Sequence, residues 1–386
     1  MKKFLALILA LVMSLSLVAC GGSKEETKPT EEKPTETEQP AEETGADVSV
    51  AMITDYGDIT DQSFNQTTYE ACKAYCDANG VQFSYYKPAG DSTAERVAMV
   101  EAAVDDGYTV VVMPGYAFGE TITQVADEYS DITFIALDVG EGDLGDYTLP
   151  SNVYCAVYQE ELCGYMAGYA AVKLGYTHLG FLGGMAVPAV VRYGYGFVQG
   201  ADAAATETGA DVTMEYVYGN QFWGDADITA YMDNWYQTLG VEVVFACGGG
   251  IYASAAEAAA KVGGKVIGVD VDQAAIIDGG YGDGMTVTSA MKGLAPTVEH
   301  MLTEVAAGNF ANYGGKIETL GLVSGDDPAA NYVQIPMEST QWSDSFSQDD
   351  YKALVKDMFD GKITVSNDIS AMPATSIAVN EYGNIK

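Results

Sequence analysis

The chain has 386 residues and a formal net charge of −37, with 55 acidic side chains against 18 basic ones. This excess of acid argues against nucleic acid as a partner, because binding to nucleic acid depends on lysines and arginines that neutralise phosphates. It also disfavours contact between the folded part and an anionic membrane surface. Acidity of this kind is typical of soluble proteins exposed outside the cell.

The first twenty residues have the pattern of an export signal that ends in a lipid-attachment site. Lys2 and Lys3 precede an apolar run over 4–19, and Cys20 follows. The run is short for a membrane-spanning helix, which needs about 20 residues, and it suits a signal peptide. The ending LVAC at 17–20 resembles a bacterial lipobox, so residues 1–20 are predicted to be a lipoprotein signal with Cys20 as the lipidated residue. The alternative is an ordinary secretory signal that contains a cysteine.

Residues 21–47 consist mainly of Glu, Thr, Pro, Lys and Gly, with almost no large apolar side chain. Such a segment cannot offset the entropy lost on ordering, so it predicts a disordered acidic tether. We therefore expect a folded part held at the extracytoplasmic face of the cell membrane, in contact with the membrane through the lipid alone.

Strand-like runs alternate with amphipathic stretches along the rest of the chain. The strand candidates are residues 48–54, 81–87, 109–113, 133–137, 152–157, 178–182, 212–218, 241–246, 265–269, 285–289 and 316–320. The helix candidates are residues 62–79, 93–106, 119–129, 158–174, 191–208, 225–239, 254–262 and 292–307. This alternation predicts an α/β fold built from βαβ units with parallel sheets.

The length of about 340 residues after the tether is more than one core usually holds, so two doubly wound lobes are expected. The first lobe is predicted over 48–156 and is completed by about 288–325. The second lobe is predicted over 157–287 and is completed by about 326–386. A ligand cleft lies between two such lobes, where the carboxyl ends of their strands face each other.

The stretch over 48–66 contains the most informative of the strand-end loops. An uncharged strand is followed by a polar loop that includes Asp55, and Phe64 and Asn65 come where a helical pattern begins. An aromatic ring beside an amide suits a planar polar ligand, because the ring stacks and the amide reads a hydrogen-bonding edge. The alternative is that Phe64 packs into the core. Other strand-end loops carry Asp138, the segment 219–225, the glycines at 248–250, Asp270 and Lys292.

Signatures of catalysis and of metal binding are absent from the sequence. It contains no GxxxxGK[ST] phosphate loop, no HExxH and no GxSxG, and His178 and His300 lack partners at metal spacing. Asp270 and Asp272 are two apart on an extended segment, so they point to opposite faces. We therefore expect a binding protein rather than an enzyme, with no cofactor and no metal.

Five cysteines follow the predicted lipid site: Cys72, Cys76, Cys155, Cys163 and Cys247. Their number is odd and their spacings match no zinc signature. Most are interpreted as small buried apolar residues, while a disulfide between two of them stays open.

An ordered series of motifs resembles the basic membrane protein family of bacterial lipoproteins, substrate-binding proteins of ABC transporters that include purine-nucleoside-binding members. The segments are ITDYGDITDQSFNQ at 53–66, SNVYCAVYQEELCGYMAGYAA at 151–171, LGFLGGMAVPAVVRYGYGFVQGA at 179–201, VVFACGGG at 243–250, VIGVDVDQ at 266–273 and VTSAMKGL at 287–294. Together they lie within roughly residues 48–325. The resemblance implies a periplasmic-binding-protein type I fold, with two lobes that are joined by a hinge and close around a nucleoside. It also implies delivery of that ligand to an ABC permease and its ATPase, and we expect a monomer.

The resemblance also implies roles for individual residues. Phe64 would stack on the base, Asn65 and Asp138 would bond its edge, and Asp55 lies in the strand-end position of the same motif. The second stacking ring would come from the segment 219–225, where Trp223 aligns slightly better than Phe222. Asp270 would hold the ribose hydroxyls, helped by Lys292 and by the backbone at Gly248 or Gly249.

Three alternatives stay open on the sequence. A sugar or autoinducer binder shares the two-lobe fold and also uses aromatic side chains, so the fold alone does not decide. A sensory protein would bind a ligand without transport, and a nucleoside hydrolase would cleave it. The segment 219–225 and the chain after about 325 also depart from the family pattern, which leaves the identity of the ligand more open than its class.

Overall fold

The computed structural model describes residues 48–386, and the predicted signal, Cys20 and the tether over 21–47 lie outside the described residues. Among residues 48–386, no helix combines the length and the apolarity needed to span a bilayer.

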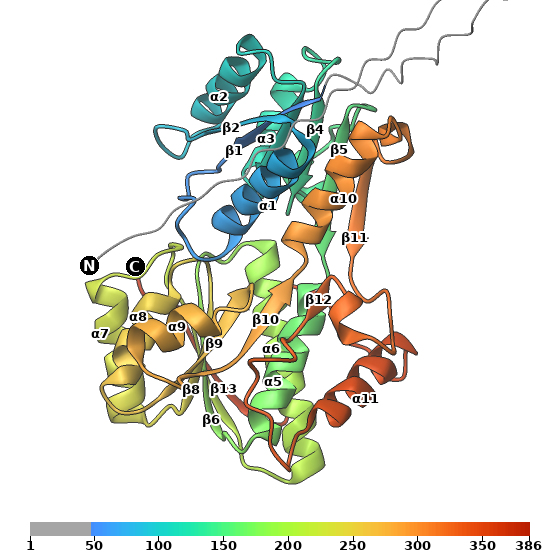
Figure 1. Ribbon diagram of the computed structural model, residues 1–386. Coiled ribbons are helices and arrows are strands. Elements are labelled where there is room, and N and C mark those ends of the chain that lie inside the picture. Colours follow the sequence, from blue (N-terminus) through green and yellow to red (C-terminus); the bar gives the residue numbers. More distant parts are fainter. Residues whose placement is uncertain (1–47) are drawn as a thin grey trace, which may run out of the picture. The chain divides into compact units, whose positions relative to one another are not determined.

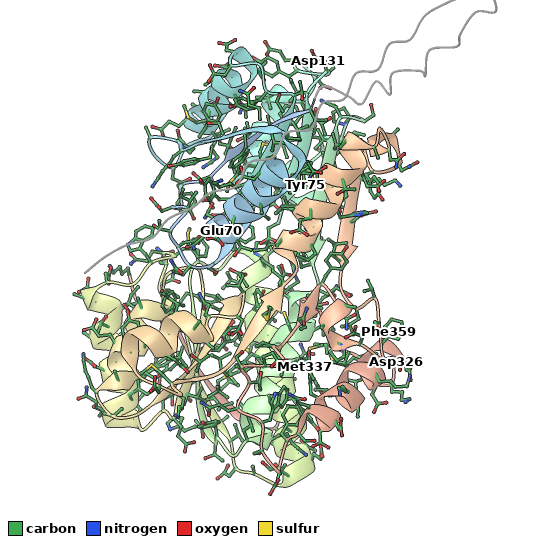
Figure 2. All side chains as sticks on the ribbon, in the orientation of Figure 1. Glu70, Tyr75, Asp131, Asp326, Met337 and Phe359 are labelled. Carbon is green, nitrogen blue, oxygen red and sulfur yellow. The ribbon has the colours of Figure 1, made fainter. Side chains whose placement is uncertain are left out.

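The first sheet has six strands in the order β11-β5-β4-β3-β1-β2, and every pairing in it is parallel (Figure 1). Its strands are β1 (Ser49–Ile53), β2 (Gln82–Tyr86), β3 (Val110–Pro114), β4 (Thr133–Leu137), β5 (Val153–Tyr158) and β11 (Lys316–Leu320). The helices that pack with it are α1 (Phe64–Asn79), α2 (Thr93–Asp105), α3 (Phe118–Val125), α4 (Glu141–Leu144) and α10 (Leu294–Ala306). Tyr75 of α1 points toward α10, where its hydroxyl donates to the Leu302 carbonyl at 3.1 Å (Figure 2).

The second sheet has seven strands in the order β12-β10-β9-β8-β6-β7-β13, parallel except that β12 runs antiparallel to β10. Its strands are β6 (His178–Gly183), β7 (Thr213–Tyr218), β8 (Val243–Cys247), β9 (Lys265–Asp270), β10 (Thr286–Lys292), β12 (Val333–Gln334) and β13 (Ala378–Asn384). The helices that follow its strands or pack with it are α5 (Glu160–Lys173), α6 (Pro188–Thr208), α7 (Ala226–Asn234), the π-helical turn Trp235–Leu239, α8 (Tyr252–Ala260), α9 (Ala274–Tyr281) and α11 (Gln348–Phe359). Short 3₁₀ turns cover Phe310–Asn312 and Pro328–Ala330.

These sheets confirm the predicted α/β fold. Each reverses its strand order once, between β1 and β3 in the first sheet and between β6 and β8 in the second. Ligands of doubly wound sheets bind at such switch points, outside the carboxyl ends of the strands. Residue 288, near which the chain was expected to return to the first lobe, falls inside β10 of the second sheet, so the chain leaves that sheet only after Lys292. The lobe boundaries themselves stay a prediction.

Helices α5 and α6 are in backbone contact through four glycines. A Cβ added at Gly164, Gly168, Gly196 or Gly200 would lie 2.0–2.2 Å from a backbone carbonyl oxygen of the facing helix. A carbonyl held in a helix cannot rotate away as a side chain does, so both helices would have to separate. Because Glu160 and Arg192 lie near the starts of α5 and α6, this contact also sets the position of two charges near the cleft.

We expect Gly168→Ala to lower the free energy of unfolding by about 1–3 kcal/mol, as overpacking of a tight contact does. Gly279→Ala in α9 is the matched control, because a Cβ there meets no atom within 4 Å and removal of a helical glycine gains up to about 1 kcal/mol. Urea unfolding of the two variants measures both values. Equal effects of the two substitutions would contradict the packing argument.

Glu161, at the start of α5, is a buried carboxylic acid. Its side chain is 3% exposed, and Oε2 has no hydrogen-bond partner within the described residues. Burial, with a smaller contribution from the neighbouring Glu160, raises the pKa of Glu161 from 4.5 to about 7. Between pH 4.5 and about 7, the Glu161 carboxyl therefore keeps its proton in the folded state and releases it in the unfolded chain. Its contribution to stability is complete below pH 4.5 and is lost as the pH rises toward 7.

Glu161→Gln keeps the shape of the side chain and removes the titration. Relative to the variant, we expect the wild type to lose up to roughly 3 kcal/mol of unfolding free energy between pH 4 and pH 8, from 1.36 kcal/mol per pKa unit. Denaturant unfolding at several pH values measures this difference, with Glu128→Gln on the exposed surface as the control for loss of one charge. A difference that stays constant over this range would show that folding does not raise the pKa of Glu161.

Candidate functional site

A cavity of about 1040 Å³ opens between the strand ends of the two sheets. Its volume is at the upper end of the range for small-molecule sites. All ten residues predicted to contact the ligand line it, namely Asp55, Phe64, Asn65, Asp138, Phe222, Trp223, Gly248, Gly249, Asp270 and Lys292. They come together because the carboxyl ends of parallel strands meet at one edge of each sheet. Their contact with a ligand stays a prediction.

The loop after β1 is held in place by two carboxylates that accept backbone hydrogen bonds. Asp55 Oδ1 accepts from the N–H groups of Tyr56 at 2.6 Å and Gly57 at 2.7 Å. Asp61 accepts from the N–H groups of Ser63, Asn65 and Gln66 at 2.9–3.1 Å. Asp61 therefore satisfies the free N–H groups at the start of α1, where helices leave four such donors. This geometry fixes the first residue of α1, Phe64, at the cavity.

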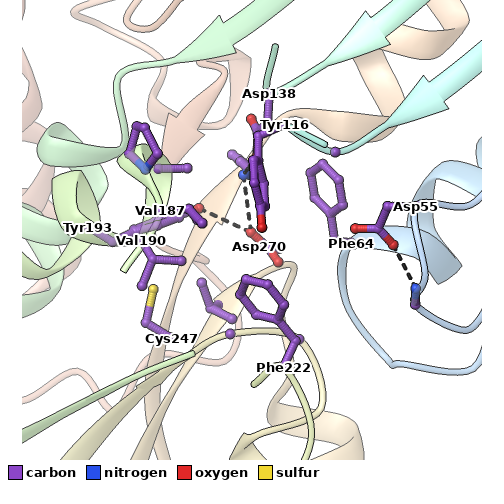
Figure 3. A pocket seen from close by; sticks show the side chains of 18 of the residues that line it. Asp55, Phe64, Tyr116, Asp138, Val187, Val190, Tyr193, Phe222, Cys247 and Asp270 are labelled. Atoms are coloured by element: carbon purple, nitrogen blue, oxygen red, sulfur yellow. Dashed lines mark hydrogen bonds and ion pairs between the residues drawn. The ribbon is translucent and has the colours of Figure 1, made fainter. Parts of the chain in front are cut away.

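Phe64 is half-buried: it packs against the core and also lines the cavity. A role in core packing is therefore compatible with a role in stacking on a ligand. Figure 3 shows its ring facing the interior of the cavity, across from Asp270 and Phe222. Asn65, next in α1, is 5% exposed, and its Oδ1 has no hydrogen-bond partner among the described residues. The loop thus offers a ring and an amide acceptor at one place.

A buried ammonium group, that of Lys292, lies at the centre of the site. Its Nζ is 2.5 Å from Asp138 Oδ2 and 3.6 Å from both Glu160 Oε1 and Asp270 Oδ1. Burial alone lowers the pKa of Lys292, but the three carboxylates outweigh this effect and raise it above its ordinary value. Nζ also lies 4.7 Å from the centre of the Phe64 ring, within reach of a cation–π interaction.

Asp138 and Asp270 both adopt left-handed backbone conformations, with φ of 60° and 65°. Non-glycine residues in this region cost of order 1–3 kcal/mol and cluster at functional sites. Asp270 Oδ2 accepts from the Ser63 hydroxyl at 2.6 Å, and Oδ1 lies 3.4 Å from the Tyr193 hydroxyl. Burial raises the pKa of Asp270, while Lys292 and Ser63 limit that rise. Asp138 Oδ1 has no hydrogen-bond partner within residues 48–386.

Phe222 and Trp223 follow each other in the segment 219–225 and lie differently. Phe222 points into the cavity (Figure 3), and its ring centre is 6.4 Å from that of Tyr56 in the loop after β1. Trp223 lines the rim and is 55% exposed. The Phe222 carbonyl accepts from the N–H of Gly250 at 2.9 Å, which fixes the segment to the glycine loop after β8.

The glycines of that loop are required by close backbone contacts. A Cβ at Gly248 would lie 2.8 Å from Gly184 Cα, in the loop after β6, and Gly249 has a φ of 53°. Substitution at either position would therefore disturb the wall of the cavity beside Phe222.

Several site residues were not predicted from the sequence. Glu160, fully buried, accepts from Arg192 Nε at 2.6 Å and faces Lys292, and Tyr193 lies beside Asp270. Glu160 follows the end of β5 by two residues and Asp138 follows the end of β4 by one, so both lie just after a strand. The expected helix start at residue 158 hid that signal, since the structure begins α5 only at Glu160.

Neither metal ligation nor disulfide bonding is present in the described part of the chain. No group of three or more His, Cys, Asp or Glu side chains within residues 48–386 has the geometry to hold a metal ion. The five cysteines there are buried and free, as expected for small apolar residues. Burial raises the pKa of Cys72 and Cys163 well above the ordinary value, which makes these thiols poor nucleophiles.

Comparisons with known proteins agree with the fold and identify the family. A CD4+ T-cell-stimulating antigen of Listeria innocua is 28% identical over 336 residues, which cover 82% of this chain and 87% of the relative. A protein of Lactococcus lactis subsp. cremoris, named ABC transporter nucleoside-binding protein BmpA, is 25% identical over 83% of this chain and 89% of its own. A solute-binding protein of an ABC transporter system from Aeropyrum pernix K1 has the same fold, with a TM-score of 0.63, 21% identity and coverage of 83% of this chain and 88% of its own.

The family assignment rests on a match that spans most of the chain. Residues 48–355 match the family described as ABC transporter substrate-binding protein PnrA-like. Proteins of this family bind a small molecule for an ABC transporter and are not enzymes. The chain therefore belongs to the PnrA-like family of ABC transporter substrate-binding proteins.

Proposed function

We propose that the cavity binds a nucleoside with a purine base and that the protein delivers it to an ABC permease. One observation carries the proposal: two aromatic rings, Phe64 at the start of α1 after β1 of the first sheet and Phe222 in the loop after β7 of the second sheet, face one cavity in which Asp270 and Lys292 form an ion pair. A flat base would stack on these rings, and a sugar with vicinal hydroxyls would suit the ion pair. The name of the Lactococcus relative supports this ligand class.

The unpartnered polar atoms support a ligand that donates hydrogen bonds. Asn65 Oδ1 and Asp138 Oδ1 are buried acceptors without a partner in the described structure, and both residues line the cavity. A purine presents N–H groups along its edge, and each hydrogen bond to a charged group is worth about 1.5–3 kcal/mol. Stacking on an aromatic ring adds about 1–3 kcal/mol per base. After association costs of several kcal/mol, these contacts support micromolar or tighter binding.

We further propose that the protein works as a monomer tethered by lipid on Cys20 at the extracytoplasmic face of the cell membrane. The lipobox-like sequence at 17–20 and the tether composition of residues 21–47 support the lipid tether. The ligand would bridge the two lobes, and its release to the permease would accompany hinge opening.

Isothermal titration of the folded part with adenosine, guanosine, inosine, uridine, ribose and a purine nucleoside monophosphate tests the ligand class. The cavity is lined by seven acidic residues, Asp55, Asp58, Asp61, Asp138, Glu141, Asp143 and Asp270, while its basic lining residues, Arg192 and Lys292, are already paired with carboxylates. We therefore expect purine nucleosides to bind and the monophosphate to bind about tenfold more weakly or worse, because like charges in contact are costly. Binding of ribose without binding of any nucleoside would overturn the proposal in favour of a sugar-binding protein.

The choice of the second stacking ring has its own test. The family resemblance slightly favours Trp223 as the second stacking ring. Because Phe222 points into the cavity and Trp223 is more than half exposed, we propose that Phe222 has this role instead. Phe222→Leu removes the ring and keeps an apolar side chain, so we expect nucleoside affinity to fall roughly five- to 150-fold, which corresponds to the loss of one stacking contact. Trp223→Leu, the control in the same loop, should leave affinity nearly unchanged. The reverse order of effects would return the role to Trp223.

A further inference from the structure

We infer that residues 378–386, which lie beyond the segment matched by the family, brace the 219–225 loop and thereby set the position of Phe222. The inference rests on the proposed role of Phe222 for its consequence in binding. Its structural part depends only on contacts between β13, β7 and the loop.

Strand β13 is paired in parallel along β7, the strand that leads into the 219–225 loop. The register runs from Ala378 opposite Thr213 to Asn384 opposite Tyr218. The N–H of Ile385 then donates to the Tyr218 carbonyl at 2.8 Å, immediately before the loop begins. β13 therefore covers the edge of β7 up to the residue where the loop leaves the sheet.

A buried carboxylate fastens β13 to its neighbours. Glu215 of β7 is 3% exposed and accepts from the Tyr382 hydroxyl at 2.6 Å and from Asn380 Nδ2 at 3.2 Å. His178 Nε2 of β6 lies 2.9 Å from the same carboxylate. Two of these three partners belong to β13, so Glu215 would be left largely unpaired without that strand. Leaving a buried charged group without partners is costly.

The contacts of Lys386 extend the brace into the loop itself. Its Nζ forms an ion pair with Asp225 and lies 3.4 Å from Gln221 Oε1. Gln221 Nε2 in turn donates to the Trp223 carbonyl and to Asp225 Oδ2, both at 2.8 Å. Lys386 thus ties together the two residues that flank Phe222 and Trp223 in the loop.

Asp225 links the same contacts to the rest of the second lobe. Its Oδ1 caps α7 by accepting from the N–H groups of Asp227 and Ile228 at 3.0 Å, while Oδ2 faces Lys386 and Gln221. The hydrogen bond from Lys386 is the largest of the effects that lower the pKa of Asp225 to about 2. On the other side, the N–H of Gly250 donates to the Phe222 carbonyl, so the loop is fixed from both sides. Lys386 therefore acts on the ring of Phe222 only through the loop.

The energetic consequence is local. The side chains of Lys386 and Asp225 are 34% and 28% exposed, and ion pairs near the surface contribute little to global stability. Loss of this pair is therefore expected to loosen the loop without unfolding the lobe. That makes Lys386 a positioning residue, whose removal is visible in loop mobility and in affinity.

The test compares Lys386→Met with Lys356→Met and Lys386→Arg in the whole folded protein. Lys356 on α11 is the matched control, because it pairs with exposed Asp326 and Asp360 elsewhere on the surface. Hydrogen–deuterium exchange of residues 219–225 is measured without ligand. We expect exchange to rise up to about fivefold in Lys386→Met, to stay at the wild-type rate in Lys356→Met and to be restored in Lys386→Arg. The purine nucleoside that binds the wild type should lose affinity by a similar factor in Lys386→Met alone.

Each result decides a separate point. Unchanged exchange in Lys386→Met overturns the brace. Faster exchange with unchanged nucleoside affinity overturns the positioning of Phe222 by the brace. Faster exchange in a protein whose wild type binds no nucleoside supports the brace and rejects the proposed ligand.

Discussion

The site depends on the ion pairs that the buried ammonium group of Lys292 forms with three carboxylates. An ammonium group removed from water is stable only when carboxylates compensate for the lost hydration, and here they come from three places in the chain. Asp138 follows a strand of the first sheet, Asp270 ends a strand of the second, and Glu160 lies where the chain passes from one sheet to the other. Because neither sheet supplies the whole set, the charge network exists only when both contribute.

Much of this arrangement follows from sequence patterns with a simple physical cause. Strands buried in parallel sheets are largely apolar runs, and the eleven strands expected from such runs all overlap strands of the structure. Polar residues that follow such runs collect at the carboxyl edge of a sheet, which is why Asp55, Asp138, Asp270 and Lys292 line one cavity. That prediction needs no knowledge of the contacts between lobes.

The features that escaped prediction depend on contacts between segments far apart in the chain. β13 has the sequence AVNEYGN, which contains no apolar run, and it becomes a strand because β7 and Glu215 provide hydrogen bonds across more than 160 residues. The backbone of the 219–225 loop likewise sets which of Phe222 and Trp223 points into the cavity. In this loop Asn220 has a φ of 58°, and the Phe222 carbonyl accepts from the N–H of Gly250. Neither constraint leaves a periodic trace in the sequence.

The hydrogen-bonding capacity of the site also limits what it can recognise. A carboxylate offers about four acceptor positions, and three of those of Asp270 are directed at Ser63, Tyr193 and Lys292, which leaves about one for a hydroxyl group of a ligand. Among residues 48–386, the buried acceptors of the cavity lining that lack a hydrogen-bond partner are Oδ1 of Asn65 and Oδ1 of Asp138, whereas the two basic lining residues, Arg192 and Lys292, are paired with carboxylates. A cavity with free acceptors and with both basic side chains already paired is expected to favour uncharged molecules that carry N–H and O–H donors, in agreement with the proposed ligand class. The ion pairs that link the two sheets therefore also leave the cavity without a free basic group for a ligand.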